Sequence, residues 1–252
     1  MGWGAAIRGG AKAAGRGIVG FALPPRCAGC GAIQSEDHRF CLACWQALGL
    51  GAARPVCPRC ALPIDAGDEA PCTGCRADPP PWDAARAAVA YGPVARGIAL
   101  RLKHGGRIGL AETMARQMLR LVPPGDPPLL VPVPLHRRRI WWRGYNQAAL
   151  IARRLAAAGA GTLAVDAIRR ARPTPLLRGL GARARRQAVR GAFTPAPGAT
   201  VAGRRVILVD DVLTTGATAA ACAQVLRRAG AARIEVIVWA RVNRPGGDVF
   251  DF

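Results

Sequence analysis

The fold prediction for this chain starts from the stretch VILVDDVLTTGAT at residues 206–218. Its apolar, β-branched beginning, 206–209, is typical of a buried parallel strand. Asp210 and Asp211 follow directly, at the strand end where open α/β sheets bind their ligands. The turn at 214–218 leads into an alanine-rich helix, whose first N–H groups attract a phosphate. We therefore expect a sugar phosphate here, with its hydroxyls on the acids and its phosphate on the turn.

An ordinary strand–turn–helix unit with threonine caps would give a similar pattern. Capping, however, does not require two adjacent acids at the end of a strand. The paired acids therefore favour a ligand site over a purely structural turn.

The composition is that of a folded protein. The 252 residues suffice for one or two domains, and 51% of them are hydrophobic. The sequence holds no uncharged apolar run of about eighteen residues, so we predict no membrane span. Arg8, Lys12 and Arg16 interrupt the first 21 residues, which lack the apolar stretch of a signal peptide. We therefore expect a cytoplasmic protein.

The formal net charge is +21, and almost all the bases are arginine. Such a chain attracts nucleic acid, anionic membrane surfaces or phosphorylated ligands. A coding bias towards Ala, Arg, Gly and Pro is the alternative explanation. Charge alone therefore does not establish binding to nucleic acid.

Cysteines dominate the N-terminal third. Eight of the nine form four Cys-x-x-Cys pairs, and two such knuckles complete a tetrahedral zinc site. The spacing predicts two closed, structural zinc sites, the first made by Cys27, Cys30, Cys41 and Cys44 and the second by Cys57, Cys60, Cys72 and Cys75. Spacing alone leaves crossed pairing of the knuckles open. Disulfides or redox dithiols are the alternative, which a cytosolic location and four regular pairs disfavour. Cys222 instead fits a small buried residue.

These features divide the chain into three parts. Residues 1–22 form an N-terminal segment that could be helical, although seven glycines between positions 2 and 20 oppose a helix. Residues 23–78 form the double zinc ribbon, which would fold largely through its metal. The prolines at 79–81 mark a stiff linker at the start of an α/β domain that covers residues 79–252.

Strands and helices alternate in that domain. Besides the strand at 206–209, we expect strands at 87–91, 129–134, 163–168 and 233–240, and helices at 94–121, 146–158 and 218–229, the first one broken at Gly105-Gly106. This order predicts an open, mainly parallel sheet flanked by helices, with right-handed crossovers.

Three further segments carry basic residues. Lys103 and His104 precede the helix break, either as a solvated helix end or as part of a site. Residues 136–147 form a basic loop after a strand, and arginine forks beside a helix N-terminus suit pyrophosphate. An exposed arginine cluster without a ligand is the alternative. Residues 169–200 are long and irregular, as in a mobile lid or a disordered insert.

The chain resembles the ComF family, in which a double zinc ribbon precedes a type I phosphoribosyltransferase domain. The matching stretches are LKHGG at 102–106, VPVPLHRRR at 131–139, RGYNQA at 143–148, Arg172-x-Thr174-Pro175, RGAF at 190–193 and the stretch at 206–218. Members of the family include proteins associated with DNA uptake in natural competence and relatives linked to gluconate utilisation.

The resemblance implies a role for each matching position. Asp210 and Asp211 would contact the ribose hydroxyls of phosphoribosyl pyrophosphate (PRPP) and serve catalysis together with Arg139 and Arg143. The other PRPP contacts would come from Lys103, from Arg138 and Gly144 on the pyrophosphate side, and from Thr214, Thr215, Gly216, Ala217 and Thr218 around the 5′-phosphate. Residues 170–193 would be the lid. Leu176, Leu177 and Ala188 depart from the family pattern there, which leaves the acceptor open.

The leading hypothesis is a Mg²⁺-dependent phosphoribosyltransferase that acts on an unknown acceptor and is linked to DNA uptake. Mg²⁺ would bridge pyrophosphate and ribose oxygens, while the protein supplies positioning and charge stabilisation.

The second hypothesis is a non-enzymatic accessory factor for DNA uptake. Its zinc ribbons and arginines would bind single-stranded DNA, and its PRPP site would be a sensor or a vestige. Aromatic residues are sparse in the ribbons, where Phe40 and Trp45 stand, and this disfavours stacking on bases. A third hypothesis makes the ribbons structural, as a roof over the acceptor pocket or a means of self-association. The sequence does not predict the oligomeric state.

Overall fold

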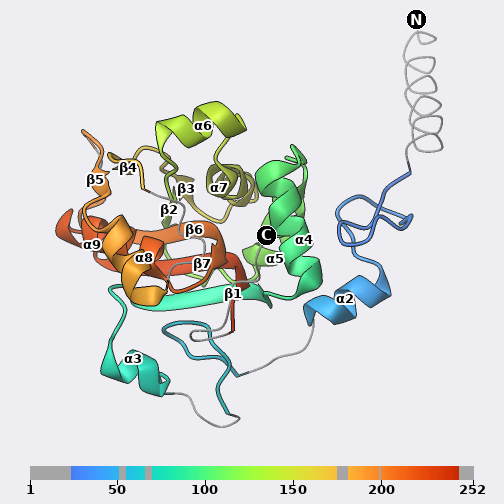
Figure 1. Ribbon diagram of the computed structural model, residues 1–252, viewed down its shortest axis with the longest axis horizontal. Helices are drawn as coiled ribbons and strands as arrows, with labels where there is room; N and C mark the ends of the chain where they lie inside the picture. The colour runs from blue at the N-terminus through green and yellow to red at the C-terminus, as the bar shows by residue number, and fades with distance from the viewer. Residues whose placement is uncertain (1–23, 51–54, 66–69, 175–180, 199, 244–252) are drawn as a thin grey trace, which may run out of the picture.

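The computed structural model describes residues 24–50, 55–65, 70–174, 181–198 and 200–243 (Figure 1). The helix considered for residues 1–22 therefore lies outside the described residues. The central element is a sheet of five parallel strands. In spatial order these are β1 (Ala84–Ala90), β7 (Arg233–Arg241), β6 (Arg205–Leu213), β2 (Leu129–Pro132) and β3 (Thr162–Leu163).

The middle of this sheet is buried on both faces, which explains its continuous apolar runs. Residues 206–209 of β6 and 234–240 of β7 are almost completely inaccessible to solvent. The predicted open, parallel α/β sheet is confirmed, and four of its five strands follow the predicted segments closely.

Two crossovers leave the middle of the sheet in opposite directions. Helix α7 (Gln147–Ala157) connects β2 to β3 at one edge, and α9 (Ala217–Arg228) connects β6 to β7 towards the other. Right-handed crossovers that run in opposite directions place their helices on opposite faces of the sheet. The boundary between β6 and β2 is therefore a topological switch point, where α/β sheets bind ligands beyond the carboxyl ends of the strands.

The helices form one layer on each face. Helices α4 (Pro93–His104), α5 (Leu110–Leu119) and α7 share one apolar core with Ile207 and Val209. Helix α9 shares the other core with Val206 and Leu208. Figure 1 shows α9, with α8 (Ala182–Val189) beside it, on the opposite side of the sheet from α4 and α5.

The structure corrects three expectations for the second half of the chain. The predicted strand at 163–168 is wrong, because its residues belong to two sheets. Ala164 donates the last bond to β2, at Leu130 O (2.9 Å), and the chain then turns before β4 (Ile168–Arg170) pairs antiparallel with β5 (Phe193–Pro195). The basic loop contains a helix, α6 (Arg137–Arg143). The segment expected to be irregular, 169–200, holds β4, α8 and β5.

The two ribbons, named here by their cysteine quartets, dock at different places on the α/β domain. Arg101 of α4 donates to the carbonyls of Ala28 (2.6 Å) and Gly29 (2.9 Å) in the first ribbon, which also contains α2 (Leu42–Leu48). The second ribbon contains α3 (Thr73–Ala77) and bonds to the start of β1, where Ala85 N donates to Pro58 O (3.0 Å).

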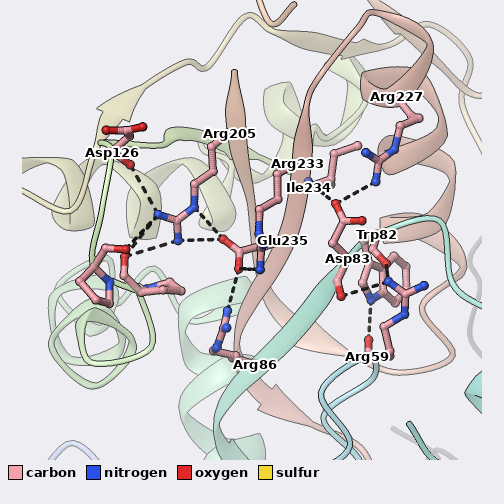
Figure 2. A network of polar contacts seen from close by, with 12 residues as sticks. Arg59, Trp82, Asp83, Arg86, Asp126, Arg205, Arg227, Arg233, Ile234 and Glu235 are labelled. Atoms are coloured by element: carbon pink, nitrogen blue, oxygen red, sulfur yellow. Dashed lines mark hydrogen bonds and ion pairs between the residues drawn. The ribbon is translucent and has the colours of Figure 1, made fainter. Parts of the chain in front are cut away.

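A buried ion cluster closes the amino end of the sheet (Figure 2). Glu235 of β7 is completely buried and accepts hydrogen bonds from Arg86 (3.2 Å), Arg205 (2.9 Å) and Arg233 (3.4 Å). Burial alone would raise the pKa of Glu235, but these guanidinium groups outweigh it and lower the pKa. The cluster joins β1, β6 and β7 at the end of the sheet away from the paired acids.

Candidate functional site

The two acids lie inside a strand rather than after it. β6 continues to Leu213 on its β7 side, but its pairing with β2 stops where Pro132 meets Val209. Asp210 and Asp211 therefore occupy the part of β6 that extends past the end of β2. Both carboxylates therefore lie beside the switch point, past the end of β2.

The alternation of side chains along β6 gives the two acids different surroundings. Asp211 falls on the face covered by α4, is 2% exposed, and forms an ion pair with the Lys103 ammonium at 2.8 Å. Asp210 falls on the face covered by α9 and is half-buried, and its Oδ1 accepts a hydrogen bond from the Asp211 amide (2.9 Å). One acid is therefore paired with a base, and the other is open to a ligand.

The same asymmetry appears in the protonation of the site. Burial and the nearby Asp211 charge raise the pKa of Asp210 to about 8. Burial lowers the pKa of Lys103, but the carboxylates of Asp211 and Asp210 outweigh it and raise the pKa above its ordinary value. Lys103 is thus a cation at neutral pH, and without a ligand Asp210 tends to hold a proton.

The turn after β6 has the backbone of an anion site. We call residues 214–218 the phosphate turn. Gly216 has φ +77° and precedes the first residue of α9, whose initial N–H groups point away from the helix. Its neighbour Thr215 is exposed, and its Oγ1 accepts a hydrogen bond from Ala217 N (3.4 Å). A Cβ on Gly216 would lie 2.8 Å from the Trp82 ring, so both the conformation and the packing require glycine.

Helix α6 supplies arginines to the same end of the sheet. Arg139 and Arg143 are four residues apart and share one face of this helix. Arg143 donates to Gln147 Oε1 (2.8 Å), and the Asp211 charge opposes the lowering of its pKa by burial. Arg138 is exposed on another face, while Gly144 ends the helix with φ +84°. Of the predicted basic residues, Lys103 is paired with Asp211, and the Asp211 charge also acts on Arg143 and His104.

Two further arginines reach the site and were not predicted. Arg185 of α8 is buried and donates from Nη1 to Thr214 Oγ1 (3.1 Å). Arg170 of β4 is buried with its guanidinium 5.3 Å from the centre of the Phe193 ring, and the Asp210 charge opposes the lowering of its pKa. The only sequence signal for them was their place in the segment assigned to a lid.

The cysteine quartets fit zinc. In each quartet the four sulfur atoms lie within 4.8 Å of one another, in the pairing predicted from the spacing. The Cys30–Cys41 and Cys60–Cys72 sulfur distances are 3.6 and 3.7 Å, close to the edge of about 3.8 Å in a tetrahedron with Zn–S bonds of about 2.3 Å. Backbone amides also point at the sulfurs, as Cys41 N does at Cys27 Sγ (3.3 Å). Cys222 of α9 is fully buried in the core, as expected for a small buried residue.

Two family models match the chain. Residues 18–84 match the double zinc ribbon domain, and residues 144–249 match the phosphoribosyl transferase domain. Within the described residues, no helix is long and apolar enough to cross a membrane.

Several curated proteins are similar over most of their length. The DNA utilization protein YhgH of Escherichia coli O157:H7 is 35% identical over 190 residues, which cover 73% of this chain and 82% of that protein. Competence protein F of Haemophilus influenzae is 30% identical over 220 residues, which cover 84% and 94%. A local match of 53 residues, 45% identical, links 21% of the chain to 29% of the adenine phosphoribosyltransferase of Mycobacterium avium.

Proposed function

Because the chain belongs to the ComF family, with its double zinc ribbon and phosphoribosyltransferase domain, we propose that it binds PRPP at the end of β6 and transfers the phosphoribosyl group to an acceptor. The observation that carries the proposal is the position of the partly exposed Asp210. Only residues 211–216 separate it from the first residue of α9. The ribose hydroxyls and the 5′-phosphate of one PRPP molecule would span these two features.

Each part of PRPP has a chemically matched partner. The carboxylates of Asp210 and Asp211 would accept hydrogen bonds from the ribose hydroxyls. The amides and hydroxyls of the phosphate turn, residues 214–218, would donate to the 5′-phosphate. Arg139, Arg143 and Lys103 would face the pyrophosphate, with Arg138 and Gly144 beside them. Mg²⁺ would arrive with PRPP as part of the substrate, held by pyrophosphate and ribose oxygens.

The transfer would be a displacement at C1 of the ribose. The C1–O bond breaks, and its electron pair leaves with pyrophosphate. A lone pair of the acceptor forms the new bond to C1, and the acceptor then loses a proton. Positive charge develops on the sugar during this step, so a carboxylate held beside the ring stabilises it, while the bases stabilise the leaving pyrophosphate. The chain's own contribution is charge placement and orientation.

Titration calorimetry with PRPP and Mg²⁺ tests the proposal. We expect binding by the wild-type protein and a loss of about 10–100-fold in affinity for Asp210→Asn, which removes charge-assisted hydrogen bonds to the ribose. Asp126→Asn, at an exposed carboxylate away from the site, is the matched control. Absence of wild-type binding, or equal affinities for all three proteins, would contradict the proposal. Release of pyrophosphate from PRPP in the presence of nucleobases, amines or DNA ends would then identify the acceptor.

A second candidate function, binding of single-stranded DNA, rests on α6. Trp141 and Trp142 are 87% and 84% exposed on this helix, next to Arg137, Arg138 and Arg139. Aromatic platforms among arginines are what sequence-tolerant binding of single strands requires. The ribbons, with their sparse aromatic residues, do not offer this combination, so the exposed tryptophans support α6 as the candidate surface instead.

A cavity of about 700 Å³ lies beside this helix. Its described lining includes one carboxylate, Asp166, and four arginines, which are Arg137, Arg153, Arg169 and Arg170. Arg137 and Ile140 of α6 line it, and Trp141 continues the same helix face. A phosphate backbone in this cavity would therefore bring a base within reach of the exposed tryptophan.

Fluorescence titration with an oligothymidine strand at low and high salt tests this candidate. The Trp141→Ala, Trp142→Ala double variant should bind at least about tenfold more weakly, whereas Trp45→Ala, at the exposed tryptophan of the first ribbon, should bind like the wild type. Affinity should fall steeply with salt, and PRPP binding should not change. If only the Trp45 variant loses affinity, the ribbon is the DNA surface.

A further inference from the structure

The knuckle of the second ribbon lies directly under the phosphate turn. Ala61, the residue after Cys60, is buried in the same apolar core as Leu213, which precedes the turn, and Ala217, which lies in it. This packing makes the ribbon part of the core beneath the turn rather than a separate module beside it.

Trp82 forms one link between the ribbon and the turn. Its indole N–H donates to the Arg59 carbonyl in the knuckle (2.6 Å), and Arg59 donates back to the carbonyls of Trp82 (3.0 Å) and Asp83 (3.1 Å), as Figure 2 shows. The far edge of the same ring lies 2.8 Å from where a Cβ on Gly216 would stand. A shift of the knuckle would therefore move the Trp82 ring, which packs against Gly216.

Arg241 forms a second, polar link. It is the last residue of β7 and pairs in register with Leu213. Its Nε donates to the Cys60 carbonyl (2.8 Å), and its Nη1 donates to the carbonyls of Leu213 (2.9 Å), Thr214 and Val242 (2.8 Å). One buried guanidinium thus joins a residue of the zinc quartet to the first residue of the phosphate turn.

The chemistry of this link makes it sensitive to the ribbon. A buried guanidinium is stable only while its N–H groups have acceptors, because an unsatisfied charged donor costs more than a neutral one. The Cys60 carbonyl keeps its place through the zinc knuckle, since Cys60 belongs to the metal quartet. Unfolding of the knuckle would remove that acceptor, and Arg241 would have to tilt and pull on the backbone at 213–214.

We propose that Arg241 is a positioning residue which couples the second zinc ribbon to the phosphate turn, so that zinc in this ribbon sets the affinity for PRPP. The affinity part of this proposal rests on the proposed function, whereas the coupling of ribbon and turn does not. The first ribbon contacts the α/β domain elsewhere, through Arg101 of α4.

Hydrogen exchange of the amides at 212–218 tests the coupling without any ligand. Arg241→Gln and the more conservative Arg241→Lys should exchange there at least about tenfold faster than the wild type, and Arg241→Lys less so than Arg241→Gln. Arg227→Gln is the matched control, since Arg227 lies in α9 and pairs with Asp83 (2.8 Å). Removal of zinc from wild-type protein with a chelator should accelerate the same amides. Peptides from α5 and α7 report the global fold.

Acceleration restricted to the turn supports the proposal. Unchanged exchange at 212–218 in both Arg241 variants overturns it. The proposal is also overturned if hydrogen exchange is accelerated equally in α5, α7 and the turn, in both variants and in chelated wild type. Arg241 would then stabilise the whole fold.

Calorimetry with PRPP and Mg²⁺ separates the two proposals. If wild-type protein does not bind PRPP, the proposed function fails while the exchange experiment still decides the coupling. If wild type binds and Arg241→Gln binds about tenfold more weakly, with Arg227→Gln unchanged, both are supported. By reciprocity, PRPP should then raise the affinity for one of the two zinc ions, measured at equilibrium in competition with a chromogenic chelator, and Arg241→Gln should abolish that increase. Equal PRPP affinities of wild type and Arg241→Gln contradict the affinity part.

Discussion

The Lys103 ammonium lies 2.8 Å from the Asp211 carboxylate and so joins the end of α4 to the middle of β6. This pair gives Asp211 a cationic partner, whereas Asp210 lies beside the Asp211 carboxylate, whose charge opposes its ionisation. This difference between the two acids determines how substitutions at Asp210 and Lys103 should change the stability of the ligand-free protein.

Replacing Asp210 by asparagine should stabilise the ligand-free protein, and the gain should increase with pH. The pKa of Asp210 is raised to about 8 in the folded protein, against about 4 for an unfolded chain. A raised pKa means that the stability this carboxyl contributes is complete below about pH 4 and is lost as the pH rises towards 8. The Asn variant has no such loss.

Thermal unfolding without PRPP at about pH 5.5, 7 and 8.5 measures this effect. We expect the melting temperature of Asp210→Asn to exceed that of the wild type most clearly at the highest pH. A difference in melting temperature between the two proteins that stays constant or decreases with rising pH would refute this account of Asp210.

Replacing Lys103 by glutamine should destabilise the protein. Asp211 is buried and would lose its cation, and a hydrogen bond to a charged group contributes about 2 kcal/mol. For a chain of this size that corresponds to a fall of roughly 4–8 °C in melting temperature. The double variant Lys103→Gln, Asp211→Asn should recover much of the loss, because it leaves no unpaired charge. Failure of the second substitution to recover stability would show that Lys103 acts through its packing instead.

The two cysteine quartets should each hold one zinc ion. Elemental analysis of purified protein should give two zinc ions per chain, and Cys30→Ser and Cys72→Ser should each reduce the content towards one. Cys222→Ala is the control, because Cys222 is buried in the core and should leave the content at two. A content of two in all variants would exclude the quartets as the zinc sites.

Arg185 should contribute to PRPP binding through the phosphate turn. The hydrogen bond from Arg185 to Thr214 Oγ1 joins α8 to this turn. Because Arg185→Ala removes this bond, the variant should bind PRPP about tenfold more weakly. Arg183, two residues earlier on the same helix, is exposed, and Arg183→Ala should bind PRPP normally. Equal losses in the two variants would point to the net charge of α8 rather than to this contact.

The parts of the fold that local patterns encode were predictable. The apolar run at 206–209 followed by two acids is visible in the sequence, as is the spacing of the cysteine pairs. Each depends on residues close together in the chain, and the structure confirms both the parallel sheet and the pairing of the knuckles.

The parts that depend on distant partners were not predictable. Arg170, Arg185 and Arg241 look like the other arginines in a chain of net charge +21, and only the fold provides their acceptors. Arg241, for example, bonds to the Cys60 carbonyl, which is remote in sequence. The prediction of one strand at 163–168 was wrong for the opposite reason. Its apolar pattern is local, but its first residue pairs with β2 and its last pairs with β5 in another sheet.

The cluster around Glu235 has a consequence for which substitutions this protein can tolerate. The chain has 36 basic residues and only 15 acidic ones, so a carboxylate often serves several partners. Loss of Arg86 or Arg233 would leave Glu235 with other guanidinium groups, whereas loss of Glu235 would remove the shared carboxylate of three arginines at once. Natural and engineered variants should therefore accumulate changes at arginines far more readily than at the few acids, and a scarce glutamate on β7 should be less replaceable than any one of the arginines around it.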